Sequence, residues 1–102
     1  MVHLPEPENI KDTLEHFLKG LGLYETLQGY QAVDYYNEIY SKTEPFLENT
    51  RALDIHEGIL KLEAPDSVLR FEIVVNKQNM IKAINTYFRK NIVKDIVVRT
   101  GG

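Results

Sequence analysis

Residues 51–64 read RALDIHEGILKLEA, and this stretch decides the fold. Polar and apolar side chains alternate on both sides of Glu57-Gly58, and Leu60 and Leu62 fall on one face. Two alternating runs joined by a short turn of this kind predict a β-hairpin with strands 50–56 and 59–64. Because an isolated hairpin is only marginally stable, we expect further elements to cover its apolar face.

The segment that follows the hairpin fits two structures. Residues 68–75 alternate as a strand would, and periodicity alone slightly favours that interpretation. The same residues also continue a helical stripe, because Asp66 or Ser67 is a suitable N-cap and residues 77–90 clearly predict helix. We expect Asn91 to close this helix, and residues 92–99 to form a last strand that pairs with the hairpin.

Upstream of the hairpin the apolar spacing changes to that of helices. Residues 1–8 predict an extended lead-in, and Asn9 is a suitable N-cap for a helix that ends at Gly20 and Gly22. The expected core positions of this helix are Ile10, Leu14, Phe17, Leu18 and Leu21. A second helical pattern spans residues 23–41, as one helix or as two pieces divided at Gly29, and residues 42–49 form a connector. Its apolar positions are Leu23, Leu27, Tyr30, Val33, Tyr36, Ile39 and Tyr40.

The composition describes a single small domain over residues 1–102. The chain is 43% hydrophobic and 26% charged, which excludes a disordered or low-complexity protein. No apolar run approaches the roughly 20 residues of a membrane helix, and residues 1–10 lack the apolar region of a signal peptide. The chain has no cysteine, so disulfides and thiolate chemistry are excluded. We expect a cytoplasmic protein that does not bind membranes.

The net charge of −3 hides an asymmetry along the chain. Residues 1–66 carry 5 Lys and Arg against 13 Asp and Glu, a balance of −8. Residues 67–102 carry 7 Lys and Arg against 2 acidic residues, a balance of +5. One interpretation is that the two halves neutralise each other within the fold. The other is that the basic half forms a face for phosphate or for an acidic partner.

No arrangement of residues predicts catalysis. The three histidines, His3, His16 and His56, fall on the lead-in, a helix and a strand, outside any metalloprotease or hydrolase motif. The acidic residues are scattered, without a pair placed to hold a bond between two carboxylates. We expect no enzyme, no metal site and no cofactor.

Polar and basic side chains share one face of the helix predicted after the hairpin. Gln78, Lys82, Asn85 and Arg89 are spaced by 4, 3 and 4 residues, which places them on one helical ridge. Lys90 and Lys94 lie near the end of that helix and extend the candidate site. Such a ridge fits a phosphate backbone or an acidic protein surface, and it also fits a face that is merely solvated.

Two other features have a structural and a functional interpretation. The six tyrosines could in principle stack on nucleic-acid bases, but most lie at core spacing, with Tyr35 the best exposed candidate. Residues 76–79, Asn-Lys-Gln-Asn, fall where a KH-type module would carry its G-x-x-G loop. Because bulky side chains prevent the close backbone approach that glycine allows, a polar turn of helix is the favoured interpretation.

Four segments carry a resemblance to a known family. They are GILKL at 58–62, SVLRFEI at 67–73, MIKAIN at 80–85 and VKDIVVR at 93–99. Together they resemble the DciA-like family, long catalogued as a domain of unknown function, and especially its short members of the Bacteroidetes type. The resemblance runs from Ile10 to Arg99. Where the family pattern has a Trp and then a Gly, this chain has Tyr36 and Ser41, with extra residues before Thr50.

The resemblance implies both a fold and a role. The implied fold is α+β and like a KH domain without its G-x-x-G loop: N-terminal helices, the hairpin, a helix over 66–90 and the final strand. It therefore implies helix for residues 68–75, and we adopt that expectation. The implied role is non-catalytic, because DciA proteins bind the DnaB-type replicative helicase and assist its loading on DNA.

The expected partner is accordingly the replicative helicase, in DNA replication. Any direct binding of single-stranded DNA or RNA should be weak, because phosphate neutralisation requires several convergent cations and the chain is acidic in total. The alternative is a general KH-like RNA- or DNA-binding protein.

Overall fold

The computed structural model describes the backbone of residues 7–101 and the side chains of residues 12–101. It is an α+β fold, as predicted. The elements in order are the helices α1 (Pro7–Gly20) and α2 (Tyr24–Glu38), two 3₁₀ turns (Tyr40–Lys42 and Pro45–Leu47), the strands β1 (Arg51–His56) and β2 (Ile59–Ala64), the helix α3 (Ser67–Phe88) and the strand β3 (Asp95–Thr100). None of the helices in this described part has the length and apolar character needed to cross a bilayer.

The hairpin forms as the sequence predicts. Glu57 and Gly58 both have positive φ, at 52° and 81°, which is the geometry of a tight two-residue turn that matches strand twist. β1 pairs with β2 antiparallel, with a register shift at Leu53, since Ala52 faces Leu62 and Asp54 faces Lys61. A bulge of this kind bends the edge strand.

The third strand pairs with the hairpin, as expected, and completes a sheet of order β1-β2-β3. β3 runs parallel to β2, with Leu60 beside Ile96 and Leu62 beside Val98. A parallel neighbour requires a crossover connection, and α3 supplies it. The predicted strand 92–99 begins three residues late, because Val93 is held by a side chain of α3 instead of by the sheet.

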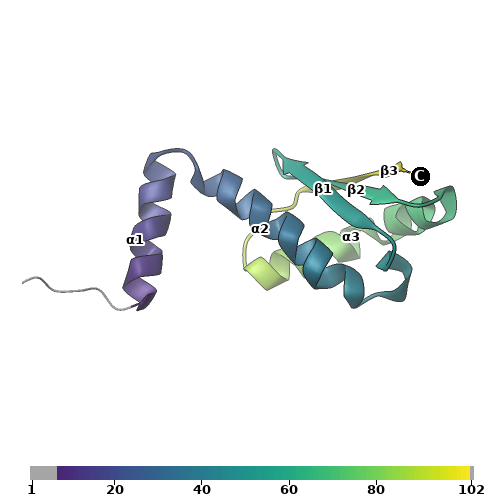
Figure 1. The fold of residues 1–102 in the computed structure, drawn as a ribbon, viewed down its shortest axis with the longest axis horizontal. Coiled ribbons are helices and arrows are strands. Elements are labelled where there is room, and N and C mark those ends of the chain that lie inside the picture. The colour runs from purple at the N-terminus through teal and green to yellow at the C-terminus, as the bar shows by residue number, and fades with distance from the viewer. Residues whose placement is uncertain (1–6, 102) are drawn as a thin grey trace, which may run out of the picture.

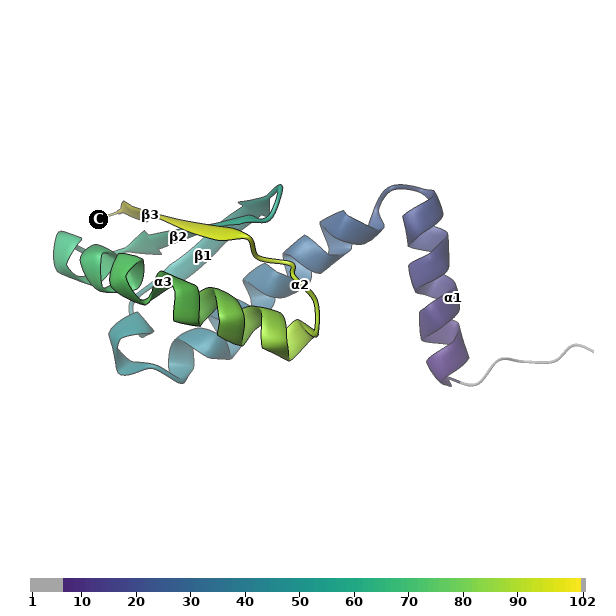
Figure 2. The ribbon, with the colours of Figure 1, turned by 180° about the vertical axis from the view of Figure 1, so that it is seen from behind.

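Both α2 and α3 pack on the face of the sheet that carries Leu60 and Leu62 (Figures 1 and 2). α2 contacts β1 and α3 contacts β3, so the core is a single layer between two helices and three strands. The opposite face, which includes Lys61 and Val97, is exposed among the described residues. The fully buried large side chains are Tyr36, Leu47, Leu60, Leu62, Ile73, Met80, Ile84, Val93 and Ile96.

α2 is one continuous helix, and Gly29 does not interrupt it. A Cβ at Gly29 would lie 2.8 Å from Cγ2 of Ile55, so this glycine lets the helix approach β1 closely. The predicted core stripe of this helix was wrong in part. Tyr36 and Tyr40 are buried and Val33 is partly buried, whereas Leu23, Leu27, Tyr30 and Ile39 are exposed.

α1 does not pack on the sheet, although its expected core positions predicted a helix that packs on the hairpin. It stands away from the body at one end of the molecule (Figure 1), and it packs against the start of α2, where Lys19 lies 4.8 Å from the centroid of the Tyr24 ring. Its predicted core residues Leu14, Phe17 and Leu21 are therefore exposed, and Leu18 is partly buried. The side chain of Ile10, the remaining predicted core residue, lies outside the described residues.

The start of α1 also differs from the prediction. The helix begins at Pro7, so Asn9 is not its N-cap. The lead-in predicted for residues 1–8 therefore does not include Pro7 and Glu8. Residues 1–6 of that lead-in lie outside the described residues.

Residues 68–75 are helical, which agrees with the family resemblance and not with the alternation. Asp66 caps the helix, since its carboxylate accepts a hydrogen bond of 2.9 Å from the backbone N–H of Leu69. Ile73 faces the core, while Phe71 and Val75 face outward. The segment is apolar on both sides of the helix, and this produces a pattern that mimics a strand. The helix ends at Phe88, before the predicted end, because Arg89 adopts a left-handed conformation with φ of 56°.

Candidate functional site

The structure divides the predicted ridge into two groups. Gln78 and Lys82 lie on the outward face of α3 and are exposed, as the helical spacing predicts. Arg89 is the C-cap of the helix, and Lys90 and Lys94 belong to the loop that leads to β3. All three are exposed; Arg89 adjoins the helix, whereas Lys90 and Lys94 lie beyond it and do not continue the line of Gln78 and Lys82.

Asn85 differs from the rest of the predicted ridge, because its side-chain amide is engaged within the protein. Its side-chain amide donates a hydrogen bond of 2.8 Å to the carbonyl of Val93, and its Oδ1 accepts one of 2.9 Å from the N–H of Val93. The amide thus pairs with both backbone groups of a residue that is 1% exposed. Asn85 fastens the 89–94 loop to α3, which positions Lys90 and Lys94.

A second asparagine does the same for α2, and no sequence pattern had indicated it. Asn37 Nδ2 donates to the carbonyl of Ala52 at 3.1 Å, and the N–H of Ala52 donates to Asn37 Oδ1 at 2.8 Å. Each asparagine imitates a strand neighbour for an otherwise unpaired backbone position. The two helices are therefore tied to the sheet side by polar pairs as well as by the core.

Lys90 is engaged by an aromatic ring. Its Nζ donates a hydrogen bond to the hydroxyl of Tyr24 and lies 4.5 Å from the centroid of the Tyr24 ring. Lys19 approaches the same ring at 4.8 Å, so two cations flank one tyrosine where α1, α2 and the 89–94 loop meet. These contacts hold Lys90 in place and reduce its freedom to follow a phosphate backbone.

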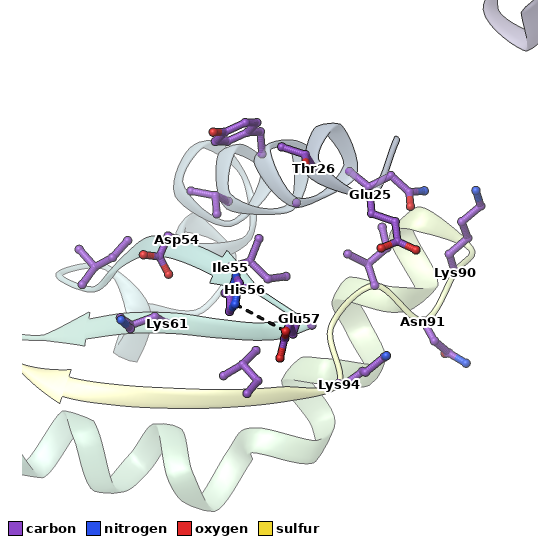
Figure 3. Close-up of a pocket in the computed structure, with 18 residues that line it drawn as sticks. Glu25, Thr26, Asp54, Ile55, His56, Glu57, Lys61, Lys90, Asn91 and Lys94 are labelled. Carbon is purple, nitrogen blue, oxygen red and sulfur yellow. Dashed lines mark ion pairs between the residues drawn. The ribbon is translucent and has the colours of Figure 1, made fainter. Parts of the chain in front are cut away.

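Lys90 and Lys94 line an open groove of about 1140 Å³ between α2, the hairpin and the 89–94 loop (Figure 3). The stem of Lys94 covers Gly58, where a Cβ would lie 2.9 Å from Lys94 Cδ. The charged side chains of the groove have both signs. The basic ones are Lys61, Lys90 and Lys94, and the acidic ones are Glu25, Asp54 and Glu57. Because its charges balance, this groove is not a concentrated phosphate site.

The tyrosines only partly match their prediction. Tyr24, Tyr36 and Tyr40 belong to the interior, as expected. Tyr35, expected to be the best exposed, stacks on Tyr87 with ring centroids 3.9 Å apart, and burial raises its pKa. Tyr30 and Tyr87 are the exposed ones, at 68% and 56%. Tyr87 is therefore more accessible to a base than Tyr35, which is only partly exposed.

Residues 76–79 form a turn of α3, as the structural interpretation predicted. Asn76 donates to the backbone carbonyl of Glu72 at 2.8 Å, and Lys77 pairs with Asp95 at 3.2 Å. Hydrogen bonds from the N–H of Ile96 and from Lys77 lower the pKa of Asp95. Lys77 therefore anchors the start of β3 to α3.

The exposed sheet face carries a charge cluster that sequence analysis did not identify. Glu63 lies between Arg51 on β1 and Arg99 on β3, with N···O distances of 3.2 and 3.0 Å. Hydrogen bonding from Arg99, with the charge of Arg51 in support, lowers the pKa of Glu63. The cluster was invisible in the sequence because its members come from three strands that meet only in the sheet.

The histidines and the acidic side chains do not form a metal site within the described residues. Among the described residues, no group of three or more His, Cys, Asp or Glu side chains is placed to hold a metal ion. His16 and His56 are exposed, and His56 contacts only the neighbouring Glu57, at 3.7 Å. His3 lies outside the described residues.

No family model, curated protein or solved structure matches the chain.

Proposed function

We propose that the protein is a non-catalytic binding module of the DciA type that associates with the replicative DNA helicase. It would act in the cytoplasm, during the initiation of DNA replication. The contact surface would be the outward face of α3, with Gln78 and Lys82, together with the adjoining Arg89.

The observation that carries this proposal is the helix over residues 67–88. Alternation in residues 68–75 favoured a strand, whereas the family resemblance implied a helix. The structure of this segment therefore distinguishes the interpretation from alternation from the interpretation by resemblance. The order of elements also agrees with what the resemblance implies: two helices, the hairpin, a long helix and a last strand. The resemblance is therefore supported at residues 68–75, the segment for which it predicted a different structure from the alternation.

The exposed side chains support binding through the surface of α3. Gln78 and Lys82 face solvent from a rigid helix, whose inner residues Ile73, Met80 and Ile84 are fully buried. Neither Lys82 nor Arg89 takes part in an ion pair within the described residues. Their charges are thus available to an acidic protein surface or to phosphate.

The alternative, a general KH-like RNA- or DNA-binding protein, requires more convergent cations. Lys90 is held against Tyr24, and Lys94 lies in a groove of balanced charge. Of the predicted site cations, Lys82 and Arg89 are left on the α3 side, and two cations support only weak phosphate binding.

The experiment is a pull-down with the purified replicative helicase alongside a gel shift with single-stranded DNA and RNA. The test variant is Lys82→Glu with Arg89→Glu, and the matched control is Lys42→Glu with Lys61→Glu, which changes the net charge equally at exposed sites elsewhere. The control should fold within about 0.5 kcal/mol of the parent protein. The test variant should lose about 1 kcal/mol at most, because position 89 caps the negative C-terminal end of α3. We expect helicase capture by the parent and the control and reduced capture by the test variant.

Two results would count against the proposal. Absence of helicase capture, together with a salt-sensitive gel shift, would favour the nucleic-acid-binding alternative. In that case the salt slope of the test variant should fall by roughly one for each phosphate that Lys82 or Arg89 neutralises in the parent. Capture of helicase by all three proteins alike would show that the α3 surface is only a solvated face.

A further inference from the structure

Two helical stripes in this chain have the same spacing and lack a partner among the described residues. Leu14, Phe17 and Leu21 follow positions i, i+3 and i+7 along α1 and the turn after it, and Val68, Phe71 and Val75 repeat that spacing on the outward side of α3. The central phenylalanines Phe17 and Phe71 are 61% and 68% exposed. A helix that is apolar on two sides, as the first half of α3 is, normally has both sides buried.

The two stripes cannot meet within one molecule of this shape. The chain is elongated, with extents of 62 × 24 × 23 Å. α1 stands at one end, joined to the body through the start of α2, and the first turns of α3 lie towards the other end (Figure 2). Within residues 12–101, therefore, the two stripes cannot cover each other in one molecule, whereas two copies can bring them together.

Charge makes the two regions complementary. Residues 7–38, which include α1 and α2, carry six acidic against two basic side chains, a balance of −4. Residues 67–90, which include α3, carry five basic against one acidic, a balance of +4. None of the ion pairs within residues 12–101 joins α1 or α2 to α3, so the opposite charges do not neutralise each other locally.

We propose that two copies of this chain pair side by side in opposite directions, with α1 of each copy docked on the outward stripe of α3 in the other. A twofold axis relates the two contacts, so the assembly closes as a dimer. Opposite orientation also places the acidic end of each copy beside the basic helix of its partner.

The size of the surface favours two contacts over one. If each largely exposed apolar side chain covers on the order of 100 Å², one α1–α3 contact buries roughly 600 Å², which is the scale of a packing contact. Two contacts bury roughly 1,200 Å², which reaches the lower range of specific interfaces. Reciprocal exchange is therefore required for a stable pair, and a dimer of moderate affinity is expected.

Cysteine cross-linking tests the arrangement directly, because the chain contains no cysteine of its own. Phe17→Cys and Phe71→Cys proteins are prepared separately, mixed and oxidised, and Val97→Cys on the exposed sheet face is the control. We expect the mixed disulfide between positions 17 and 71 to be the main product. Disulfides of 17 with 17 or of 71 with 71 as the main product would overturn the proposal, as would equal cross-linking by the control.

Sedimentation equilibrium of the full chain gives a second readout that does not involve the helicase. The parent protein should show twice the chain mass of 11.8 kDa at the upper end of the micromolar range. Phe17→Glu and Phe71→Glu should each restore the single-chain mass, while Val97→Glu should remain dimeric. A parent protein that stays monomeric throughout, or loss of the dimer in only one of the two phenylalanine variants, would overturn the proposal.

Discussion

Replacement of Asn85 by alanine should destabilise the protein although the residue lies on the predicted binding ridge. The substitution removes the two hydrogen bonds to Val93 and leaves a buried N–H and a buried carbonyl without those partners. Each buried backbone group without a partner costs about 1–3 kcal/mol. The better helix propensity of alanine returns at most about 0.7 kcal/mol. The net loss in the free energy of unfolding is therefore about 1–5 kcal/mol, and we expect a value of at least about 2 kcal/mol.

Urea unfolding followed by circular dichroism measures this loss. With a urea m value of about 1–3 kcal/mol/M, the midpoint should fall by roughly 1 M. Gln78→Ala is the matched control, because Gln78 is on the same helix and is exposed, and it should stay within about 0.5 kcal/mol of the parent. An Asn85→Ala protein as stable as this control would refute the assignment of Asn85 to the loop clamp.

Asn85→Asp refines the same prediction. The aspartate side chain has nearly the same shape as asparagine, and its oxygen still accepts the hydrogen bond from the N–H of Val93. An ionised carboxylate, however, cannot donate a hydrogen bond to the Val93 carbonyl. Protonation restores a donor, so the stability gap between this variant and the parent should narrow as the pH falls. A gap that widens on acidification would contradict the predicted donor role of the Asn85 amide.

Three further changes test other parts of the fold. Tyr36→Phe removes the 2.6 Å hydrogen bond to Thr50 and should lower the unfolding free energy by about 1 kcal/mol in urea; an unchanged value would show that this bond is not stabilising. Gly58→Ala, at a φ of 81°, should cost about 1–2 kcal/mol in the same assay, and a neutral result would contradict the left-handed turn. The hydrogen bond from Arg99 lowers the pKa of Glu63 below its usual 4.5. The ionised Glu63 carboxylate therefore stabilises the fold above pH 4.5, and this stabilisation is lost as the pH falls through the lowered pKa. Glu63→Gln should therefore be less stable than the parent at neutral pH only, as thermal melts across pH would show.

The hairpin could be predicted because its determinants are local. The alternation of residues 51–64 and the turn at Glu57 and Gly58 lie within one short stretch, and both strands formed where expected. The helix over residues 68–75 could not be predicted from periodicity, because Phe71 and Val75 add an outward apolar face to the inward one. The family resemblance corrected this, since it relates to the whole order of elements.

The candidate site was harder to predict than the fold. Helical spacing correctly placed Gln78 and Lys82 on the exposed side of α3. It did not reveal that the Asn85 amide is engaged within the protein, because the loop after Arg89 brings Val93 back to that side chain. Similarly, the stripe of α1 has the pattern of a core helix, but no part of the described chain covers it.

The central claim, association with a replicative helicase, is tested most directly by sedimentation velocity. Fluorescently labelled protein is mixed with the purified helicase and, in a parallel sample, with single-stranded DNA at physiological salt. The proposal predicts that the labelled protein sediments with the helicase boundary and remains slow with DNA alone. Labelled protein that sediments at its own slow rate in the presence of saturating helicase would contradict the claim.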